Sequence, residues 1–277
     1  MSASNKPFRS ALAISRAGAS PTLDTHLLFD SGYSDSKASP LDEFLTRIDE
    51  INKLTPHPNE FNIYQGQLIL LGAVAAVESF IRTLFRKIIN IDPEAQSCVH
   101  GSEVSFGAAL HLKPDLLPEA ILERISFAGR GGITEAMKSL LGVKGALPPD
   151  LKEAVDEYAR ICHLRHCAVH RFGKLGANNA IALGLDQHKA LIEKPLTFDY
   201  ASLQNGISII TGFVKTINNF LFNEILSRVP RESWTGRYNR DRALFLRYYA
   251  LFVDSTSVVK SAPAKDLHRQ FMNQLGV

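Results

Sequence analysis

The most informative part of the sequence for the fold is residues 63–90, which read IYQGQLILLGAVAAVESFIRTLFRKIIN. Apolar residues recur there every three or four positions, as they do on one face of an α-helix. They form two adjacent stripes: Ile63, Leu70, Val74, Val77, Ile81, Leu84 and Ile88 in one, and Tyr64, Leu68, Leu71, Ala75, Phe85 and Ile89, with Glu78 and Arg82, in the other. A helix with two such stripes is covered on most of its surface. We therefore expect a central helix over about Asn59–Asn90, which Asp92 and Pro93 end.

The rest of the sequence predicts further helices and one hairpin. Helical spacing recurs in five segments, which are Leu41–Leu54, Leu151–His170, Tyr200–Val229, Arg240–Asp254 and Lys265–Leu275. Residues 94–149 are expected to form short helices broken by Gly and Pro, with Arg130 in a loop. Two short apolar runs, Ala180–Leu185 and Ala190–Phe198, predict a hairpin. The expected fold class is all-α, a helical bundle with two long antiparallel helices, short helices and this one small β-hairpin.

The chain divides into three predicted parts. Residues 1–40 are rich in Ser, Ala and Gly and lack sustained periodicity, so we expect a flexible tail rather than a transit peptide. Residues 41–229 form the predicted bundle. Residues 230–277 are expected to form a basic and aromatic helical extension packed on that bundle.

Composition excludes several classes of protein. A hydrophobic fraction of 45% and a charged fraction of 21% are ordinary for a globular protein, and a net charge of +3 does not by itself indicate nucleic-acid binding. Three cysteines without a C-x-x-C pair argue against a disulfide scaffold or a cysteine zinc site and favour a reducing, cytoplasmic location. The most apolar run, Leu68–Val77, is shorter than the roughly 20 residues that span a bilayer, so no membrane partner is expected.

Motifs for nucleotide and acyl chemistry are missing. The glycine-rich segment 129–132 lacks the Gly-Lys-Ser/Thr ending of a phosphate-binding loop, and no nucleophile elbow occurs. We therefore expect neither NTP hydrolysis nor acyl transfer, and no cofactor.

One arginine interrupts the apolar stripe of the helix predicted over Leu151–His170. That stripe is Leu151, Val155, Tyr158, Cys162, Arg165 and Val169. A guanidinium stays charged and is costly to bury without a partner. Arg165 is therefore expected to meet a carboxylate, such as Glu78 or Glu157, a phosphate, or water in a cleft.

Three histidines lie beside this arginine. His163, His166 and His170 fall within about 60° of one another on a helix. The spacing of His166 and His170 suits zinc, but no nearby carboxylate or cysteine motif completes a tetrahedral site, so no metal is predicted. Three interpretations of the cluster stay open, which are a zinc site, a structural role, and a pair of groups that cleaves a phosphodiester.

The string RHCAVH, residues 165–170, resembles the R-x4-6-H motif of the HEPN family of RNA-cleaving domains. A second match, Arg160 with His166, overlaps it. The context is similar as well, since a turn with Gly173 follows and an earlier apolar helix carries Glu78 within AAVESFIRTLF. The resemblance covers about residues 41–229. The family pattern includes nothing specific that matches residues 92–149 or the segment after residue 230.

The resemblance implies a helical, metal-independent endoribonuclease, typical of toxins and effectors of bacterial toxin–antitoxin and anti-phage defence systems. Arg165 would hold the phosphate and His170 would move protons while the RNA 2′-hydroxyl attacks phosphorus, with His166 as the next candidate and Glu78 in support. The products would be a 2′,3′-cyclic phosphate and a 5′-hydroxyl. An antitoxin or a defence-system partner protein is also implied.

Helix geometry adds an expectation about assembly. Arg165 and His170 point about 140° apart on a straight helix, so one copy does not focus both on one phosphate. A two-fold homodimer with a composite site, usual in the family, would do so. Glu78 has two interpretations: it pairs with Arg82 one turn away, or it orients Arg165 or a histidine.

A basic and aromatic segment follows the bundle. Residues 228–249 contain the arginines Arg228, Arg231, Arg237, Arg240, Arg242 and Arg247 and the aromatic residues Trp234, Tyr238, Phe245, Tyr248 and Tyr249. This composition fits RNA contact, a partner-protein surface, or a solvated face above core aromatics. The predicted RNA-binding residues are Arg160, Arg171, Lys174, Arg237 and Arg240. The alternative function is a non-catalytic helical module that binds RNA or a protein.

Overall fold

The structure, a computed structural model, describes residues 14–15 and 18–276 and divides the chain into two compact units, residues 1–36 and 37–277. In the described part of the first unit, Thr25–Leu28 form a short 3-10 helix, η1. The prediction of a flexible tail over residues 1–40 falls in part on residues 1–13 and 16–17, which lie outside the described residues.

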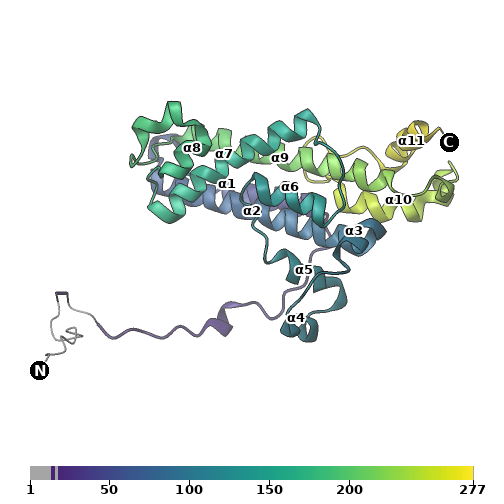
Figure 1. Ribbon diagram of the computed structural model, residues 1–277, viewed down its shortest axis with the longest axis horizontal. Helices are drawn as coiled ribbons and strands as arrows, with labels where there is room; N and C mark the ends of the chain where they lie inside the picture. The colour runs from purple at the N-terminus through teal and green to yellow at the C-terminus, as the bar shows by residue number, and fades with distance from the viewer. Residues whose placement is uncertain (1–13, 16–17, 277) are drawn as a thin grey trace, which may run out of the picture. The chain divides into compact units, whose positions relative to one another are not determined.

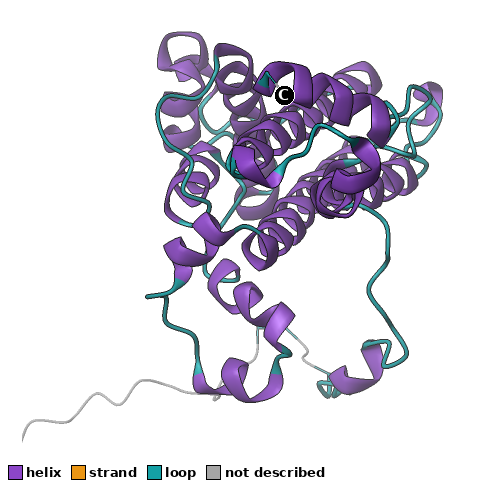
Figure 2. Cartoon of the chain, turned by 90° about the vertical axis from the view of Figure 1, so that its right-hand side faces the viewer, coloured by secondary structure: helices purple, strands orange, loops and turns teal. Residues whose placement is uncertain are grey.

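The second unit is a helical bundle, which confirms the predicted all-α class (Figure 1). Its α-helices are α1 (Pro40–Asn52), α2 (Ile63–Ile91), α3 (Pro93–Val99), α4 (Phe106–His111), α5 (Leu117–Leu122), α6 (Arg130–Ser139), α7 (Pro149–Arg171), α8 (Ala177–His188), α9 (Tyr200–Ser227), α10 (Tyr238–Phe252) and α11 (Ala264–Leu275). Within the described residues no strand occurs, and Figure 2 accordingly shows helices joined by loops.

The core of the unit is built from α1, α2, α7 and α9. The Phe61 ring, just before α2, lies 6.3 Å from the Tyr200 ring at the start of α9. At the other end, Arg228 just after α9 pairs with Asp92 just after α2 at 2.9 Å. The two long helices therefore run parallel, and the predicted antiparallel arrangement is wrong. The reason is α7, which lies between them in the chain, runs opposite to both, and returns the chain to the end where α2 begins.

Helix α2 begins and ends at polar caps. The Asn62 side chain accepts a hydrogen bond from the Tyr64 N–H, and Asp92 ends the helix and caps the next one by accepting from Ala95 N–H. By length and composition α2 could cross a membrane, with a mean hydropathy of 1.9, although 56% of that window is buried inside the bundle. The run Leu68–Val77 covers only part of this window, because isolated polar residues do not interrupt the apolar helix. Burial on this scale is also typical of the central helix of a bundle.

The segment predicted to form a β-hairpin is helical over its first run, and residues 192–198 of its second run are turn and loop with one isolated bridge from Pro195 to Lys174. Residues Ala177–His188 form α8, which Gly184 kinks at φ 107°, and Lys189–Leu191 form the 3-10 helix η4. Short apolar runs do not distinguish a strand from a buried helix, and the three alanines of α8 favour helix. Arg130 likewise lies in the first turn of α6 rather than in a loop, and it pairs with Asp156 of α7 at 3.0 Å.

The C-terminal helices pack on the bundle, where α10 contacts α1, α2 and α9. Trp234, Phe245 and Tyr248 are at most 5% exposed. His268 lies 3.0 Å from the buried carboxylate of Asp241. These aromatic rings are core residues, so they do not form the exposed surface for stacking bases that the sequence allowed.

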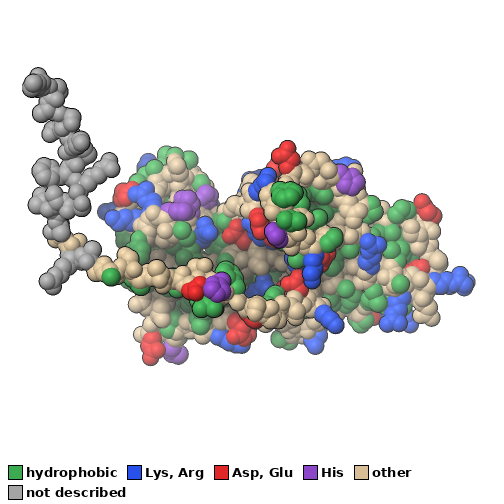
Figure 3. Space-filling model, turned by 90° about the horizontal axis from the view of Figure 1, so that it is seen from below, with side chains coloured by type: hydrophobic (Ala, Val, Ile, Leu, Met, Phe, Trp, Pro, Cys, Tyr) green, Lys and Arg blue, Asp and Glu red, His purple; other side chains and the backbone are tan. Residues whose placement is uncertain are grey.

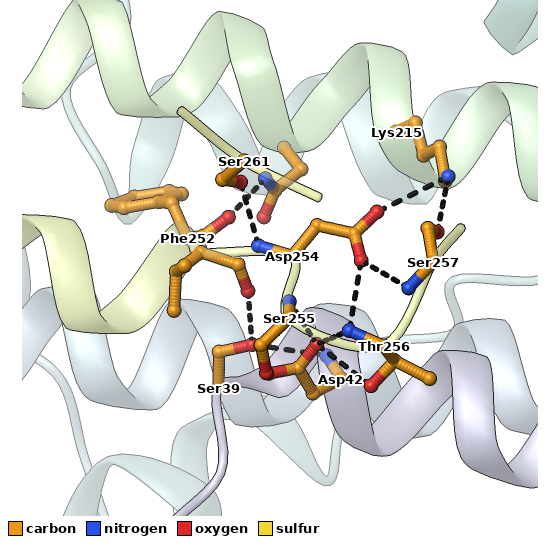
Figure 4. A network of polar contacts seen from close by, with 11 residues as sticks. Ser39, Asp42, Lys215, Phe252, Asp254, Ser255, Thr256, Ser257 and Ser261 are labelled. Atoms are coloured by element: carbon orange, nitrogen blue, oxygen red, sulfur yellow. Dashed lines mark hydrogen bonds and ion pairs between the residues drawn. The ribbon is translucent and has the colours of Figure 1, made fainter. Parts of the chain in front are cut away.

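A polar network ties the loop after α10 to the start of α1 (Figure 4). The buried Asp42 carboxylate accepts hydrogen bonds from the backbone N–H and hydroxyl groups of Ser255 and Thr256. Asp254 pairs with Lys215 of α9 at 3.2 Å. Burial opposes the ionisation of Asp254, but hydrogen bonds from the loop and from Lys215 lower the pKa of its carboxyl group overall.

Candidate functional site

The C-terminal half of α7 carries the predicted motif. The helix begins at Pro149, after Pro148, and Asp150 lies in its first turn. Proline suits this position because the first N–H groups of a helix have no partner. The helix ends at Phe172, which has left-handed backbone angles of φ 51° and ψ 43°, one residue before the predicted Gly173.

Helices α2 and α7 lie side by side in opposite directions. The Tyr64 ring at the start of α2 lies 5.5 Å from the Phe172 ring at the end of α7. Further along the pair, the Glu78 charge acts on Tyr158 and Cys162 of α7. The RHCAVH segment therefore lies near the end of the α2–α7 pair where α2 begins.

Arg165 is partly buried and forms no hydrogen bond or ion pair with any residue that the structure describes. Two other partly buried arginines, by contrast, have hydrogen-bond partners in the protein. The Arg228 side chain is 11% exposed and bonds to Asp92 and Glu224, and Arg82 donates to backbone carbonyl oxygens of the loop after α5. The carboxylates considered as partners for Arg165 are used elsewhere, since Glu157 lies 3.7 Å from Arg160. The N–H donors of the Arg165 guanidinium are therefore not used by any described residue.

Glu78 holds a loop rather than an arginine. Its Oε1 atom accepts a hydrogen bond from the Phe127 N–H at 3.2 Å, and the Tyr158 hydroxyl donates to the Phe127 carbonyl oxygen at 3.3 Å. The pair of Glu78 with Arg82 that one interpretation required is not formed in this structure. Glu78 thus anchors the loop before α6 to the α2–α7 pair.

Burial controls the acid–base state of the groups next to Arg165. It raises the pKa of the Tyr158 hydroxyl, and it raises the pKa of the Cys162 thiol to about 12. The Glu78 carboxylate adds to both shifts and Arg165 opposes them. Both groups stay protonated at neutral pH, so neither serves as a nucleophile or a metal ligand.

The three histidines separate into two roles. His163 Nδ1 lies 3.0 Å from Asn179 Oδ1 of α8, and the Asn179 amide donates to Cys167 Sγ, so His163 ties α8 to α7. His166 and His170 are exposed, and their ring centroids lie 4.5 Å apart. Neither forms a hydrogen bond to the protein within the described part of the chain. In that same part, no group of three His, Cys, Asp or Glu side chains could hold a metal ion.

The pKa of His166 differs from the ordinary value of an imidazole. Partial burial, followed by the positive charges of His170 and Arg165, lowers its pKa below the ordinary value of 6.5. The neutral imidazole is therefore favoured at neutral pH, which is the form that accepts a proton.

The predicted RNA-binding residues lie in two places. Near the motif, Arg160, Arg171 and Lys174 are exposed, although Arg160 lies near Glu157 and Arg171 pairs with Glu193. The end of the bundle that carries α8, on the left of Figure 1, exposes histidine and Lys/Arg side chains among apolar ones in Figure 3. Arg237 and Arg240 are exposed near the start of α10. The structure does not bring these two sets into one cluster by any contact among the described residues.

Two aromatic residues beside the motif were missed by the sequence interpretation. Phe172 is 75% exposed and Tyr64 is 55% exposed. Tyr64 belongs to an apolar stripe that periodicity assigns to the core, and Phe172 precedes the glycine expected in the turn. A phenylalanine two residues after a candidate motif was the signal available.

Comparisons with known proteins do not assign the chain to a family. No protein-family model, no curated protein and no solved structure matches the chain. The functional argument therefore rests on the residues and their geometry.

Proposed function

We propose that the protein is a metal-independent endoribonuclease of HEPN type. The observation that supports this most is Arg165, which is partly buried and lacks a protein partner within the described residues, beside the adjacent imidazoles of His166 and His170. A guanidinium presents donors that match phosphate oxygens, and imidazoles move protons near neutral pH. RNA phosphodiester cleavage needs these two capacities and no cofactor.

The chemistry follows from these groups. A neutral imidazole, for which the lowered pKa suits His166, removes the proton of the 2′-hydroxyl. The bond from O2′ to phosphorus forms, and the bond from phosphorus to O5′ breaks. A protonated imidazole gives its proton to the leaving 5′-oxygen, while Arg165 stabilises the charge on the phosphate. The products are a 2′,3′-cyclic phosphate and a 5′-hydroxyl, and DNA is not cut because it lacks the 2′-hydroxyl.

The arrangement of the histidines favours a homodimer. In-line displacement places the attacking and leaving oxygens on opposite sides of phosphorus. The rings of His166 and His170 are 4.5 Å apart on one helix, so both reach the phosphate from the same side. A second copy related by a two-fold axis supplies the second imidazole pair. The action of a toxic effector in bacterial defence, restrained by a partner protein, is the setting that the resemblance implies.

The direct test is RNA cleavage in EDTA. Wild type is compared with the double variant R165A/H170A and with the controls H111A and R242A, which change an exposed histidine on α4 and an exposed arginine on α10. Wild type and both controls should cleave, the double variant should not, and all should melt alike. Cleavage by the double variant would refute the assignment. RNA binding without cleavage by wild type would instead support the non-catalytic module.

A further inference from the structure

We infer that Tyr64 and Phe172 form a platform on which an unpaired RNA base stacks next to the cleavage site. This inference rests on the proposed function, because it names the feature of the RNA that the same site recognises. Both rings lie where the start of α2 meets the end of α7, and Phe172 follows His170 by two residues.

The two rings are exposed and already in contact. Phe172 is 75% exposed and Tyr64 is 55% exposed, yet their centroids lie 5.5 Å apart with 39° between the planes. The pair continues into the exposed side chains of Leu68 and Val169. An exposed apolar patch of this kind beside a proposed active site marks a binding surface.

The backbone of Phe172 does not account for a phenylalanine there. The residue has φ 51° and ψ 43°, a left-handed conformation that is unfavourable for a bulky side chain and easy for glycine. Gly173, the next residue, also has a positive φ, of 89°. Glycine at position 172 would satisfy the turn, so the ring itself needs another explanation.

The surrounding charges favour a nucleic acid. Residues 158–185 contain no Asp or Glu. Of the cations within them, Arg160 lies near Glu157 and Arg171 pairs with Glu193, but Arg165 and Lys174 form no ion pair with a described residue. Cations interleaved with exposed rings fit a polyanion whose bases have flat faces. A duplex keeps its bases stacked inside, so the occupant is single-stranded RNA.

The experiment measures binding without cleavage. The probes are a fluorescent single-stranded DNA octamer, which lacks the reacting 2′-hydroxyl, and the same octamer with abasic sites in place of bases. The variants are F172G, Y64A and the conservative F172W. The control F106A removes an exposed phenylalanine, 83% exposed, from the short helix α4. Thermal melting and oligomeric state are measured for each.

The inference predicts that F172G and Y64A bind the base-bearing octamer about tenfold more weakly, the effect of losing one stacked base. Their affinity for the abasic octamer should match that of wild type, and F172W and F106A should bind normally. F172G should melt no lower than wild type, because glycine relieves the backbone.

Three results would overturn the inference. F172G and Y64A could bind the base-bearing octamer as tightly as wild type while wild type cleaves RNA; the platform would then be wrong and the nuclease proposal would stand. F172G could convert a dimer to a monomer, in which case the patch is a protein interface. Wild type could fail both to bind and to cleave, and then the proposed function fails together with the platform.

Discussion

Replacing Arg165 with alanine should separate activity from stability. In the structure this guanidinium forms no hydrogen bond or ion pair with a described residue, so its removal breaks no protein contact of that kind. The cost is the packing of its stem, about 1 kcal/mol or less in the free energy of unfolding. Loss of a donor that stabilises the transition state lowers the cleavage rate by about 10²- to 10³-fold.

Arg228 provides the matched comparison. Its guanidinium lies 2.9 Å from Asp92, which is 2% exposed, and also bonds to Glu224 and to the Leu141 carbonyl oxygen. R228A leaves the Asp92 carboxylate buried with that charge unpaired, which costs about 3–5 kcal/mol. The two arginine variants should therefore behave in opposite ways, one losing activity and the other losing stability.

The assay combines urea unfolding with single-turnover RNA cleavage for wild type, R165A, R165K and R228A. R165K keeps the charge but loses the planar fork, so its rate should fall between those of wild type and R165A. If R165A lowers the free energy of unfolding as much as R228A does, Arg165 is a structural residue and the argument from its missing partner is refuted.

Three further predictions address the neighbouring groups. The acid limb of the kcat/KM profile should lie below pH 6.5, because burial and nearby positive charge lower the pKa of His166. The neutral imidazole that acts as the base is lost only when pH falls through this lowered pKa. An acid limb above pH 6.5 would contradict the role of His166 as the base. E78Q should keep both its melting temperature and its cleavage rate, since an amide oxygen still accepts from the Phe127 N–H and Glu78 forms no pair with Arg165; a loss of about tenfold in rate without a change in melting would contradict this and give the carboxylate charge a part in cleavage. Dimers formed by co-refolding R165A with H170A should regain about a quarter of wild-type activity. The reason is that about half of the dimers are mixed, and each mixed dimer has one complete site of two. No recovery of activity would argue against a composite site.

Periodicity and caps predicted most of the helices because these signals are local. Asp199 caps α9 and Asp92 ends α2, and each gives the helix boundary directly in the sequence. The apolar stripes likewise identified the most buried helix. By contrast, no periodic signal carries the direction of one helix relative to another. Helices α2 and α9 run parallel because α7 comes between them in the chain and runs opposite to both. This arrangement is a property of the tertiary packing.

The candidate site shows the same limit. The motif and its three histidines could be found from spacing on one helix. Their division into roles could not, because His163 is tied by Asn179, a residue from the next helix. The Phe127 N–H that occupies Glu78, one of the candidate partners of Arg165, also comes from another segment. The exposure of Phe172 depends on a backbone conformation that propensity assigns to glycine.

The measurement that tests the central claim most directly is the identity of the ends produced when the wild-type protein cuts RNA in EDTA. A single-stranded RNA with one 2′-deoxyribonucleotide at the preferred cleavage position serves as the control, since it lacks the attacking group there. The account predicts 2′,3′-cyclic phosphate and 5′-hydroxyl ends, with no cutting at the deoxy position. Ends with a 5′-phosphate, cutting at the deoxy position, or a requirement for added metal would contradict it.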